Sequence, residues 1–197
     1  MPKLVLASTN KGKLAELREL LAGLPLTIIG LDSFSDAPEV EETGRTFAEN
    51  ALIKARTIGD FTGELTLADD SGLEVDALNG EPGIYSARYG KPGWGDRERY
   101  RFLLERLKGT PPELRTARFR CAVALYDPRN GSLKEADGGV AGKIIDEPRG
   151  VNGFGYDPVF YLPELGQTMA ELVPEQKNDF SHRARAIRKL LKNWVEL

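Results

Sequence analysis

The sequence predicts an α/β fold with a mixed central β-sheet flanked by helices. Short apolar runs with alternating side chains recur between segments of helical periodicity, which is the pattern of strands interleaved with helices. Two long alternating runs, residues 119–125 and 133–145, are separated by a turn sequence at residues 127–131 and predict a β-hairpin. Because a hairpin is antiparallel, the sheet is expected to be mixed rather than purely parallel.

The chain begins with a predicted strand, tight turn and helix. The apolar run of residues 4–7 leads into a polar turn, and helical spacing of leucines begins at Leu14. Such a turn directs backbone N–H groups and the positive end of a helix dipole at one point. Two interpretations stay open, a phosphate-binding loop or a helix that Asn10 simply caps. The turn consists of Ser8, Thr9, Asn10, Lys11, Gly12 and Lys13.

This turn is not a Walker loop, because Lys13 is followed by Leu14 instead of Ser or Thr. A second helix is predicted over residues 46–58, where Thr46 and Glu49 have the spacing of a capping box. Lys54 falls at the border of the apolar face of this helix. Its ammonium group either reaches a cleft and is free there, or simply extends into solvent.

Two acidic groups are candidates for chemistry. A short strand at residues 65–68 is predicted to end in Asp69 and Asp70, so we expect these carboxylates at a strand end, with one of them pointing into a given cleft. Glu39, Glu41 and Glu42 lie on the loop before the second helix. If this loop folds beside Asp70, the two groups offer oxygen ligands for Mg²⁺; the alternative is an ordinary solvated acidic loop.

The remaining elements follow from glycine, proline and periodicity. Residues 80–95 are rich in Gly and Pro, which suits a lid or an interface, and a helix is predicted from Tyr100 to Leu107. Another strand is predicted at residues 159–161. The last helix is predicted to begin near Ser181, with an apolar face that extends to Trp194 and Val195.

An aromatic pair among glycines stands just before the strand at residues 159–161. The aromatic side chains of Phe154 and Tyr156 could stack on a planar base, and Asp157 could accept a hydrogen bond from a ring N–H. Alternatively, the two rings anchor a turn to the core.

Cations gather near the start of the last helix, at Lys177, His182 and Arg183. The helix dipole disfavours positive charge there. Because local rules tend to be broken at functional sites, this conflict indicates a possible site. His182 is the only histidine, and a single histidine without a partner ligand argues against a zinc site.

Composition indicates a soluble globular protein, with 41% hydrophobic and 29% charged residues. Cys121 is the only cysteine, which excludes an internal disulfide and is typical of a small core residue. The net charge of −3 gives no general attraction to nucleic acid or to an anionic membrane. The sequence contains no apolar run of the about 20 residues that a membrane span needs and no signal-peptide pattern, so we expect a cytoplasmic protein.

Taken in order along the chain, these motifs resemble the inosine triphosphate pyrophosphatase family. The resemblance covers essentially the whole sequence and is specific because every motif is present in order. It rests on the Ser8–Lys13 turn, Glu41–Gly44, Asn50-Ala51 with Lys54, Ala68–Gly72, Pro82–Arg88, Gly153–Pro158, and Lys177 with Ser181–Arg183.

The resemblance implies hydrolysis of ITP, dITP and XTP to the nucleoside monophosphate and pyrophosphate, which removes deaminated purines from the nucleotide pool. It also implies Mg²⁺ as the cofactor and a homodimer, with neither nucleic acid nor membrane as a partner. We expect a single nucleoside triphosphate pyrophosphatase domain over residues 1–197, built as two lobes with the substrate cleft between them.

Roles carry over to matching positions of this sequence. By this resemblance Asp70 is the catalytic acid, and Glu41 and Asp70 hold the metal. Because neighbouring residues of a strand face opposite ways, Asp69 is expected to support Asp70. The turn Ser8–Lys13 and Lys54 hold the triphosphate, and Ser71 contacts the substrate beside Asp70. The nucleoside pocket would be lined by Phe154, Gly155, Tyr156, Asp157, Lys177, His182 and Arg183.

Three rival functions remain open from the residues themselves. The first is a nucleotide sensor without turnover, and the second is a phosphatase or kinase that acts at the γ-phosphate. The third is RNA binding through a basic face of the last helix. That face would consist of Arg183, Arg185, Arg188, Lys189 and Lys192.

Overall fold

The structure is a computed structural model that describes residues 1–192. The predicted apolar positions Trp194 and Val195 lie outside the described residues. The strands are β1 (Lys3–Leu6), β2 (Thr27–Gly30), β3 (Leu65–Val75), β4 (Thr116–Asp127), β5 (Ser132–Ile144), β6 (Phe160–Leu162) and β7 (Gln167–Thr168). The helices are α1 (Lys11–Leu20), α2 (Phe47–Thr62), α3 (Asp96–Arg106), α4 (Pro174–Phe180) and α5 (His182–Lys192).

The strands form one mixed seven-stranded sheet in the order β2-β1-β3-β4-β5-β6-β7. Strand β1 runs parallel to β2 and to β3, with Leu6 opposite Leu67, whereas β6 is antiparallel to β5 and to β7. The α/β fold with a mixed sheet is therefore confirmed, and so is the long hairpin, which consists of β4 and β5. Strands β2 and β7 and helix α4 were not predicted from the sequence.

The chain divides into two compact units. The first unit contains residues 1–70 and 121–138 and the chain from His182 onward, and the second contains residues 71–120 and 139–181. Strands β3, β4 and β5 each run from one unit into the other.

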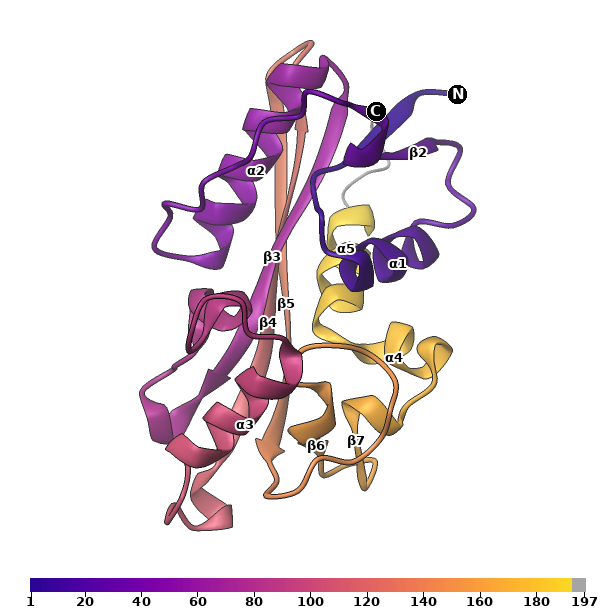
Figure 1. The fold of residues 1–197 in the computed structure, drawn as a ribbon. Coiled ribbons are helices and arrows are strands. Elements are labelled where there is room, and N and C mark those ends of the chain that lie inside the picture. The colour runs from indigo at the N-terminus through magenta and orange to yellow at the C-terminus, as the bar shows by residue number, and fades with distance from the viewer. Residues whose placement is uncertain (193–197) are drawn as a thin grey trace. The chain divides into compact units, whose positions relative to one another are not determined.

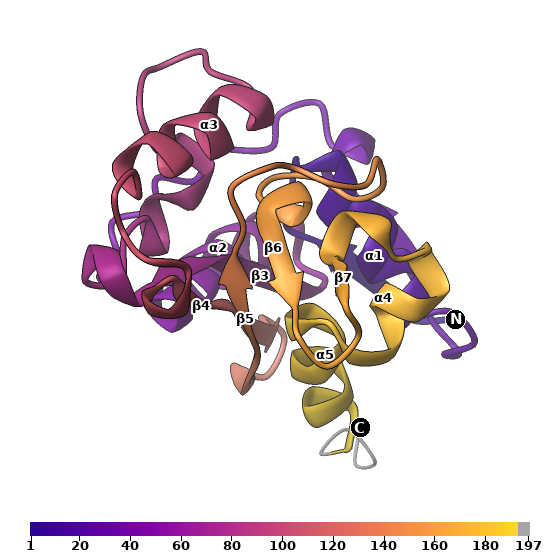
Figure 2. The ribbon, with the colours of Figure 1, turned by 90° about the horizontal axis from the view of Figure 1, so that it is seen from below.

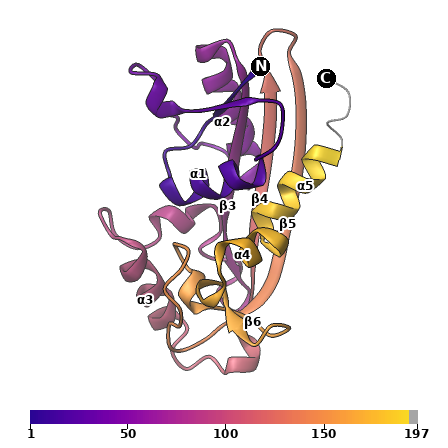
Figure 3. The ribbon, with the colours of Figure 1, turned by 90° about the vertical axis from the view of Figure 1, so that its right-hand side faces the viewer.

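The first unit packs helices on both faces of its strands (Figure 1). On one face, Leu17 of α1 and Ile187 of α5 pack against leucines and valines of β1, β3 and β4. On the other face, Ala51, Ala55 and Ile58 of α2 pack against alternate residues of the same strands. Helices α1 and α5 contact each other on their shared face, which is turned toward the viewer in Figure 3.

Helix ends in this unit follow from their capping residues. The side chain of Asn10 accepts a hydrogen bond from the Lys13 amide and caps α1, and Thr46 caps α2 through the Glu49 amide. The Glu49 carboxylate accepts from the amide of Arg45, so the predicted capping box is only half formed. At its other end α2 stops at Gly63, whose φ of 69° few other residues adopt readily.

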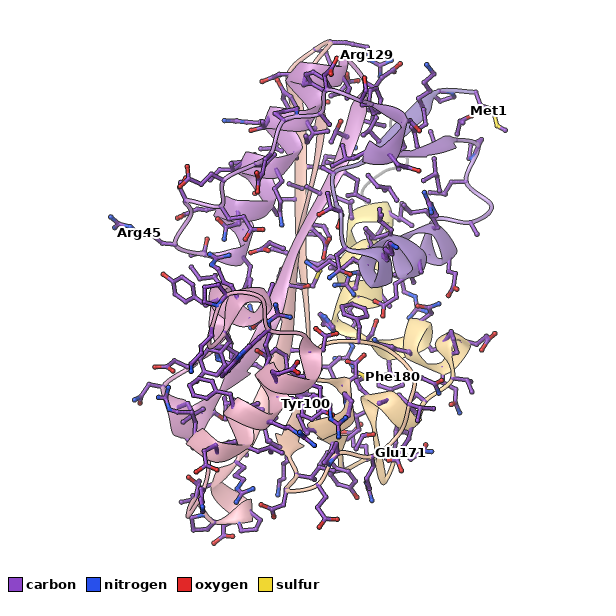
Figure 4. All side chains as sticks on the ribbon, viewed as in Figure 1. Met1, Arg45, Tyr100, Arg129, Glu171 and Phe180 are labelled. Atoms are coloured by element: carbon purple, nitrogen blue, oxygen red, sulfur yellow. The ribbon has the colours of Figure 1, made fainter. Side chains whose placement is uncertain are left out.

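The second unit has its own core, built on the other halves of β3, β4 and β5. Leu103 of α3 packs there with Phe119 and Phe160, and the partly buried rings of Tyr100 and Phe180 cover it (Figure 4). Strands β6 and β7 extend the sheet beside β5 in this unit (Figure 2).

The prediction that the two aspartates end a strand is wrong. Residues 65–75 form a single strand of 11 residues, and Asp69 and Asp70 lie at its middle. A polar Asp-Asp-Ser-Gly sequence is typical of a turn, but here partly buried lysines compensate both carboxylates, so the strand continues through them. None of the helices within residues 1–192 is both long and apolar enough to cross a membrane.

Candidate active site

The two aspartates of β3 point to opposite faces of the first unit. Successive side chains of a strand alternate, and Leu67 packs on the α1/α5 face whereas Ala68 packs on the α2 face. By the same alternation Asp69 meets side chains of α1 and α5, and Asp70 meets side chains of α2. Each carboxylate therefore has its own set of partners.

Asp70 belongs to a group that we call the Asp70 cluster, which consists of Asp70, Asn50, Lys54 and Glu42. The Lys54 ammonium donates to Asp70 Oδ1 at 3.1 Å and to Glu42 Oε1 at 2.9 Å. The Asn50 amide nitrogen donates to Asp70 Oδ2 at 3.2 Å. The interpretation of Lys54 as a free ammonium is wrong, because its charge lies between two carboxylates.

Asn50 also fastens the acidic loop to α2. Its side-chain oxygen accepts from the Gly44 N–H at 2.8 Å while its nitrogen holds Asp70, so one fully buried amide connects loop, helix and strand. A Cβ at Gly44 would come within 2.6 Å of that oxygen, which explains the glycine. On this loop Glu41 is exposed and Glu42 is half-buried against Lys54.

The electrostatics of the Asp70 cluster suit proton transfer. Burial raises the pKa of Asp70 above its usual value, although the charge of Lys54 opposes this shift. Burial also acts to lower the pKa of Lys54, but the neighbouring Asp70, Asp69 and Glu42 outweigh it and raise that pKa. Asp70 is therefore a carboxylate that can accept a proton beside a permanent positive charge.

Asp69 belongs to a second group, the Asp69 cluster, which consists of Asp69, Lys13, Arg183 and Glu16. Asp69 Oδ2 receives the Lys13 ammonium at 3.1 Å and the Arg183 guanidinium at 3.1 and 3.2 Å. The third guanidinium nitrogen of Arg183 donates to Glu16. Burial acts to raise the pKa of Asp69, but Lys13 and Arg183 outweigh it and hold that pKa well below its usual range.

The Asp69 cluster explains why cations stand at the start of α5. Arg183 is almost completely buried, and two carboxylates compensate the charge that the helix dipole disfavours. Arg183 is therefore not part of an exposed basic face, contrary to the RNA-binding hypothesis. Arg185, Arg188, Lys189 and Lys192 are exposed, and Lys189 pairs with Asp137 at 2.5 Å. His182 is buried at the first position of α5.

The turn Ser8–Lys13 is ordered by its own side chains. Ser8 Oγ accepts from the Asn10 N–H at 3.2 Å, and Asn10 Oδ1 accepts from the Lys13 N–H at 3.0 Å. The capping interpretation is confirmed, whereas phosphate binding stays a prediction. Thr9, Asn10 and Lys11 are exposed residues at the N-terminus of α1.

In the second unit, residues Gly153–Asp157 form what we call the aromatic loop. Asp157 Oδ2 accepts from the Phe154 N–H at 2.9 Å and from the Lys177 ammonium at 2.6 Å. The same ammonium lies 4.8 Å from the centre of the half-buried Phe154 ring. Tyr156 is a core anchor, since it is buried and its hydroxyl donates to the carbonyl of Ser86 at 2.8 Å.

The structure thus gathers the predicted residues in two sets. The first unit contains the Ser8–Lys13 turn, Lys54, Asp69, Asp70, His182 and Arg183. The second unit contains Phe154–Asp157, Lys177 and the half-buried Ser71. Among residues 1–192, no three His, Cys, Asp or Glu side chains converge closely enough to hold a metal by themselves.

Sequence reasoning assigned no role to Asn50 or Glu16. A signal existed for each of them. Asn50 is a polar residue between the apolar positions of α2, and Glu16 follows Lys13 by one helical turn.

The chain resembles proteins of one family over nearly its whole length. The model of the Ham1 family matches residues 4–193. A dITP/XTP pyrophosphatase of Geobacter sulfurreducens is 52% identical, over 95% of this chain and 94% of that protein. A dITP/XTP pyrophosphatase of Desulforamulus reducens is 51% identical, over 96% of this chain and 94% of that protein. A solved HAM1 protein from Coxiella burnetii has a TM-score of 0.90 and 46% identity, and each chain is fully covered.

Proposed function

Because the chain belongs to the Ham1 family, we propose that it hydrolyses purine nucleoside triphosphates with deaminated bases, dITP, XTP and ITP, to the monophosphate and pyrophosphate. The observation that carries this proposal is the full-length similarity to relatives named dITP/XTP pyrophosphatase. This hydrolysis would remove deaminated purines from the nucleotide pool.

The first unit would hold the phosphates. The exposed polar groups of the Ser8–Lys13 turn and the N-terminus of α1 suit the negative charge of a triphosphate. Lys54 and Lys13 would shift from their carboxylate partners toward phosphate oxygens and neutralise the charge of the leaving pyrophosphate.

Asp70 would act as the general base. It accepts a proton from the attacking water, whose oxygen bonds to the α-phosphorus while the bond to the α–β bridging oxygen breaks. Asn50 holds one oxygen of this carboxylate and so fixes its direction, whereas Lys54 would hold the other oxygen only until the substrate arrives. Asp69 would not take this role, because its cations lower its pKa and make it a weaker proton acceptor than Asp70.

The Asp70 cluster fits a magnesium ion. The carboxylates of Asp70 and Glu42 already converge on one positive charge, that of Lys54, and Mg²⁺ is commonly held by one or two carboxylates together with substrate phosphates. We propose that Asp70 and a glutamate of the acidic loop, Glu41 by family resemblance, hold Mg²⁺. When bound, Mg²⁺ supplies charge neutralisation at the phosphates.

The second unit would hold the base. Phe154 offers a half-buried ring for stacking, and the aromatic loop with Lys177 would line the nucleoside pocket. Donors that face O6 of hypoxanthine would leave the 6-amino group of adenine unpaired, at a cost of about 1 to 3 kcal/mol per group.

A product analysis tests the proposal. The protein is incubated with Mg²⁺ and dITP, XTP, ITP, GTP or ATP, and the products are separated by chromatography. We expect pyrophosphate with IMP from ITP, faster than any product from ATP. Orthophosphate with IDP would place cleavage at the γ-phosphate, and binding without turnover would indicate a nucleotide sensor.

Three substitutions test the residue roles. Asp70→Asn should abolish turnover while the unfolding transition is kept, and near-normal turnover would assign the base to another residue. Glu41→Gln and Glu42→Gln should raise the Mg²⁺ concentration needed for half-maximal activity to different extents. The variant with the larger increase over wild type identifies the carboxylate that binds the ion. We also propose, from the family resemblance, a cytoplasmic homodimer, which light scattering and cell fractionation would test.

A further inference from the structure

We propose that Asp96, the first residue of α3, is a positioning residue that fixes Phe154 in the orientation for stacking on the purine base. Asp96 is remote in sequence from the aromatic loop, and the family motifs described above do not include it. This inference rests on the proposed function for the role of the loop, although the contact itself is independent of that role.

The peptide groups on both sides of Phe154 are held by carboxylates. The N–H of Phe154 donates to Asp157 Oδ2 at 2.9 Å, and the N–H of Gly155 donates to Asp96 Oδ2 at 2.7 Å. With both peptide planes fixed, the φ and ψ of Phe154 are fixed as well, and so is the direction of its Cα–Cβ bond. The ring can then turn only about its own side-chain bonds. The Lys177 ammonium lies 4.8 Å from the ring centre and packs against it.

The Asp96 carboxylate is itself oriented. Its other oxygen, Oδ1, accepts from Arg99 Nη1 at 3.2 Å, one helical turn further along α3. The carboxylate therefore has one oxygen for its own helix and one for the aromatic loop. A hydrogen bond from a peptide N–H to a charged carboxylate is stronger than one between neutral groups, which suits a contact that must hold a partly buried loop in place.

The negative charge of Asp96 also stabilises the N-terminus of α3 through the helix dipole. The experiment must therefore distinguish this structural role from the positioning of Phe154. Glu98 provides the control. It lies in the same first turn and carries the same charge, but it accepts from the Gly95 N–H at 3.1 Å. Removal of either charge weakens the helix end similarly, whereas only removal of the Asp96 oxygen releases Gly155.

The experiment compares Asp96→Ala, Asp96→Asn and Glu98→Ala with the wild-type protein. For Asp96→Ala we expect KM for ITP to rise by roughly tenfold with kcat changed less than about twofold, because a contact that orients the base contributes equally to substrate and transition-state binding. Inhibition by IMP should weaken by the same factor, and inhibition by pyrophosphate should stay unchanged. Asp96→Asn keeps an acceptor oxygen and should remain within about threefold of wild type, and Glu98→Ala should match wild type.

Hydrogen–deuterium exchange of the protein without substrate gives a readout that does not depend on activity. Peptides that cover residues 153–157 should exchange about tenfold faster in Asp96→Ala than in Glu98→Ala. Equal exchange in these variants, or an unchanged KM and IMP affinity in a folded Asp96→Ala protein, would overturn the proposal. If wild-type protein hydrolyses none of the purine triphosphates, the proposed function fails, and the exchange result still decides whether Asp96 holds the loop.

Discussion

Replacement of Arg183 by methionine tests the Asp69 cluster, because it removes a buried charge and keeps most of the side-chain volume. The cluster contains two cations and two carboxylates, and Arg183 contacts both Asp69 and Glu16. Without Arg183, Lys13 remains 3.1 Å from Asp69, but one negative charge is left uncompensated. Breaking one side of a buried ion pair costs about 3 to 5 kcal/mol.

We expect the lower end of that range, about 3 kcal/mol, because Lys13 still compensates part of the charge. For a chain of this length that loss lowers the melting temperature by about 6 to 12 °C. Urea unfolding followed by circular dichroism measures the free energy directly. The control is Arg188→Met at an exposed position of the same helix, which should change the free energy of unfolding by less than about 0.5 kcal/mol. A loss below about 1 kcal/mol for Arg183→Met would refute the reasoning.

The pH dependence of this variant has a predicted sign. The folded pKa of Asp69 lies below its unfolded value of about 3.9, so its contribution to stability is fully present above that pH and is lost as the pH falls further. Removal of Arg183 raises the folded pKa, so Asp69 binds a proton at a higher pH in the variant. The difference in unfolding free energy between wild type and variant should therefore narrow as the pH falls through the raised folded pKa of the variant, and a difference that stays constant from about pH 7 to about pH 3 would contradict this cause.

Further predictions concern the cap, the loop and the thiol. Thr46→Ala removes the acceptor of the Glu49 amide and should cost about 1 kcal/mol in urea unfolding, whereas serine at this position should restore it. Gly153→Ala would place a Cβ 2.0 Å from Asp157 Oδ2 at a φ of 75°, so IMP inhibition should weaken, and the melting temperature should fall because this carboxylate is buried against Lys177. Burial raises the pKa of Cys121 to about 12, so Ellman's reagent at neutral pH should label it only in urea, and rapid labelling of the native protein would contradict its burial.

Local sequence was sufficient for the elements with strong periodicity. The caps at Asn10 and Thr46 and the hairpin turn are contacts between residues close in sequence, so their geometry follows from a few adjacent side chains. The alternation of Asp69 and Asp70 was also predictable, since it is a property of any strand. The short β2 and β7 were not, because four-residue and two-residue strands have too little periodicity.

The partners of the site residues were not predictable from the sequence. One hypothesis placed Arg183 on an exposed basic face, and neither interpretation of Lys54 gave its ammonium a carboxylate partner, because charge patterns do not show which carboxylates approach from other elements. The roles of Asn50 and Asp96 depend on contacts over 20 and 59 positions along the chain. No periodicity records such contacts.

The sequence by itself determined the α/β class, the main helices and the order of motifs that identifies the family, because these depend on local pattern and on residue identity. Only the tertiary structure showed that β3 continues through its two aspartates and that each aspartate has a different set of cations. The reason is physical. A buried carboxylate is tolerated only where opposite charges and hydrogen-bond donors from distant segments reach it, and the fold alone brings those segments together.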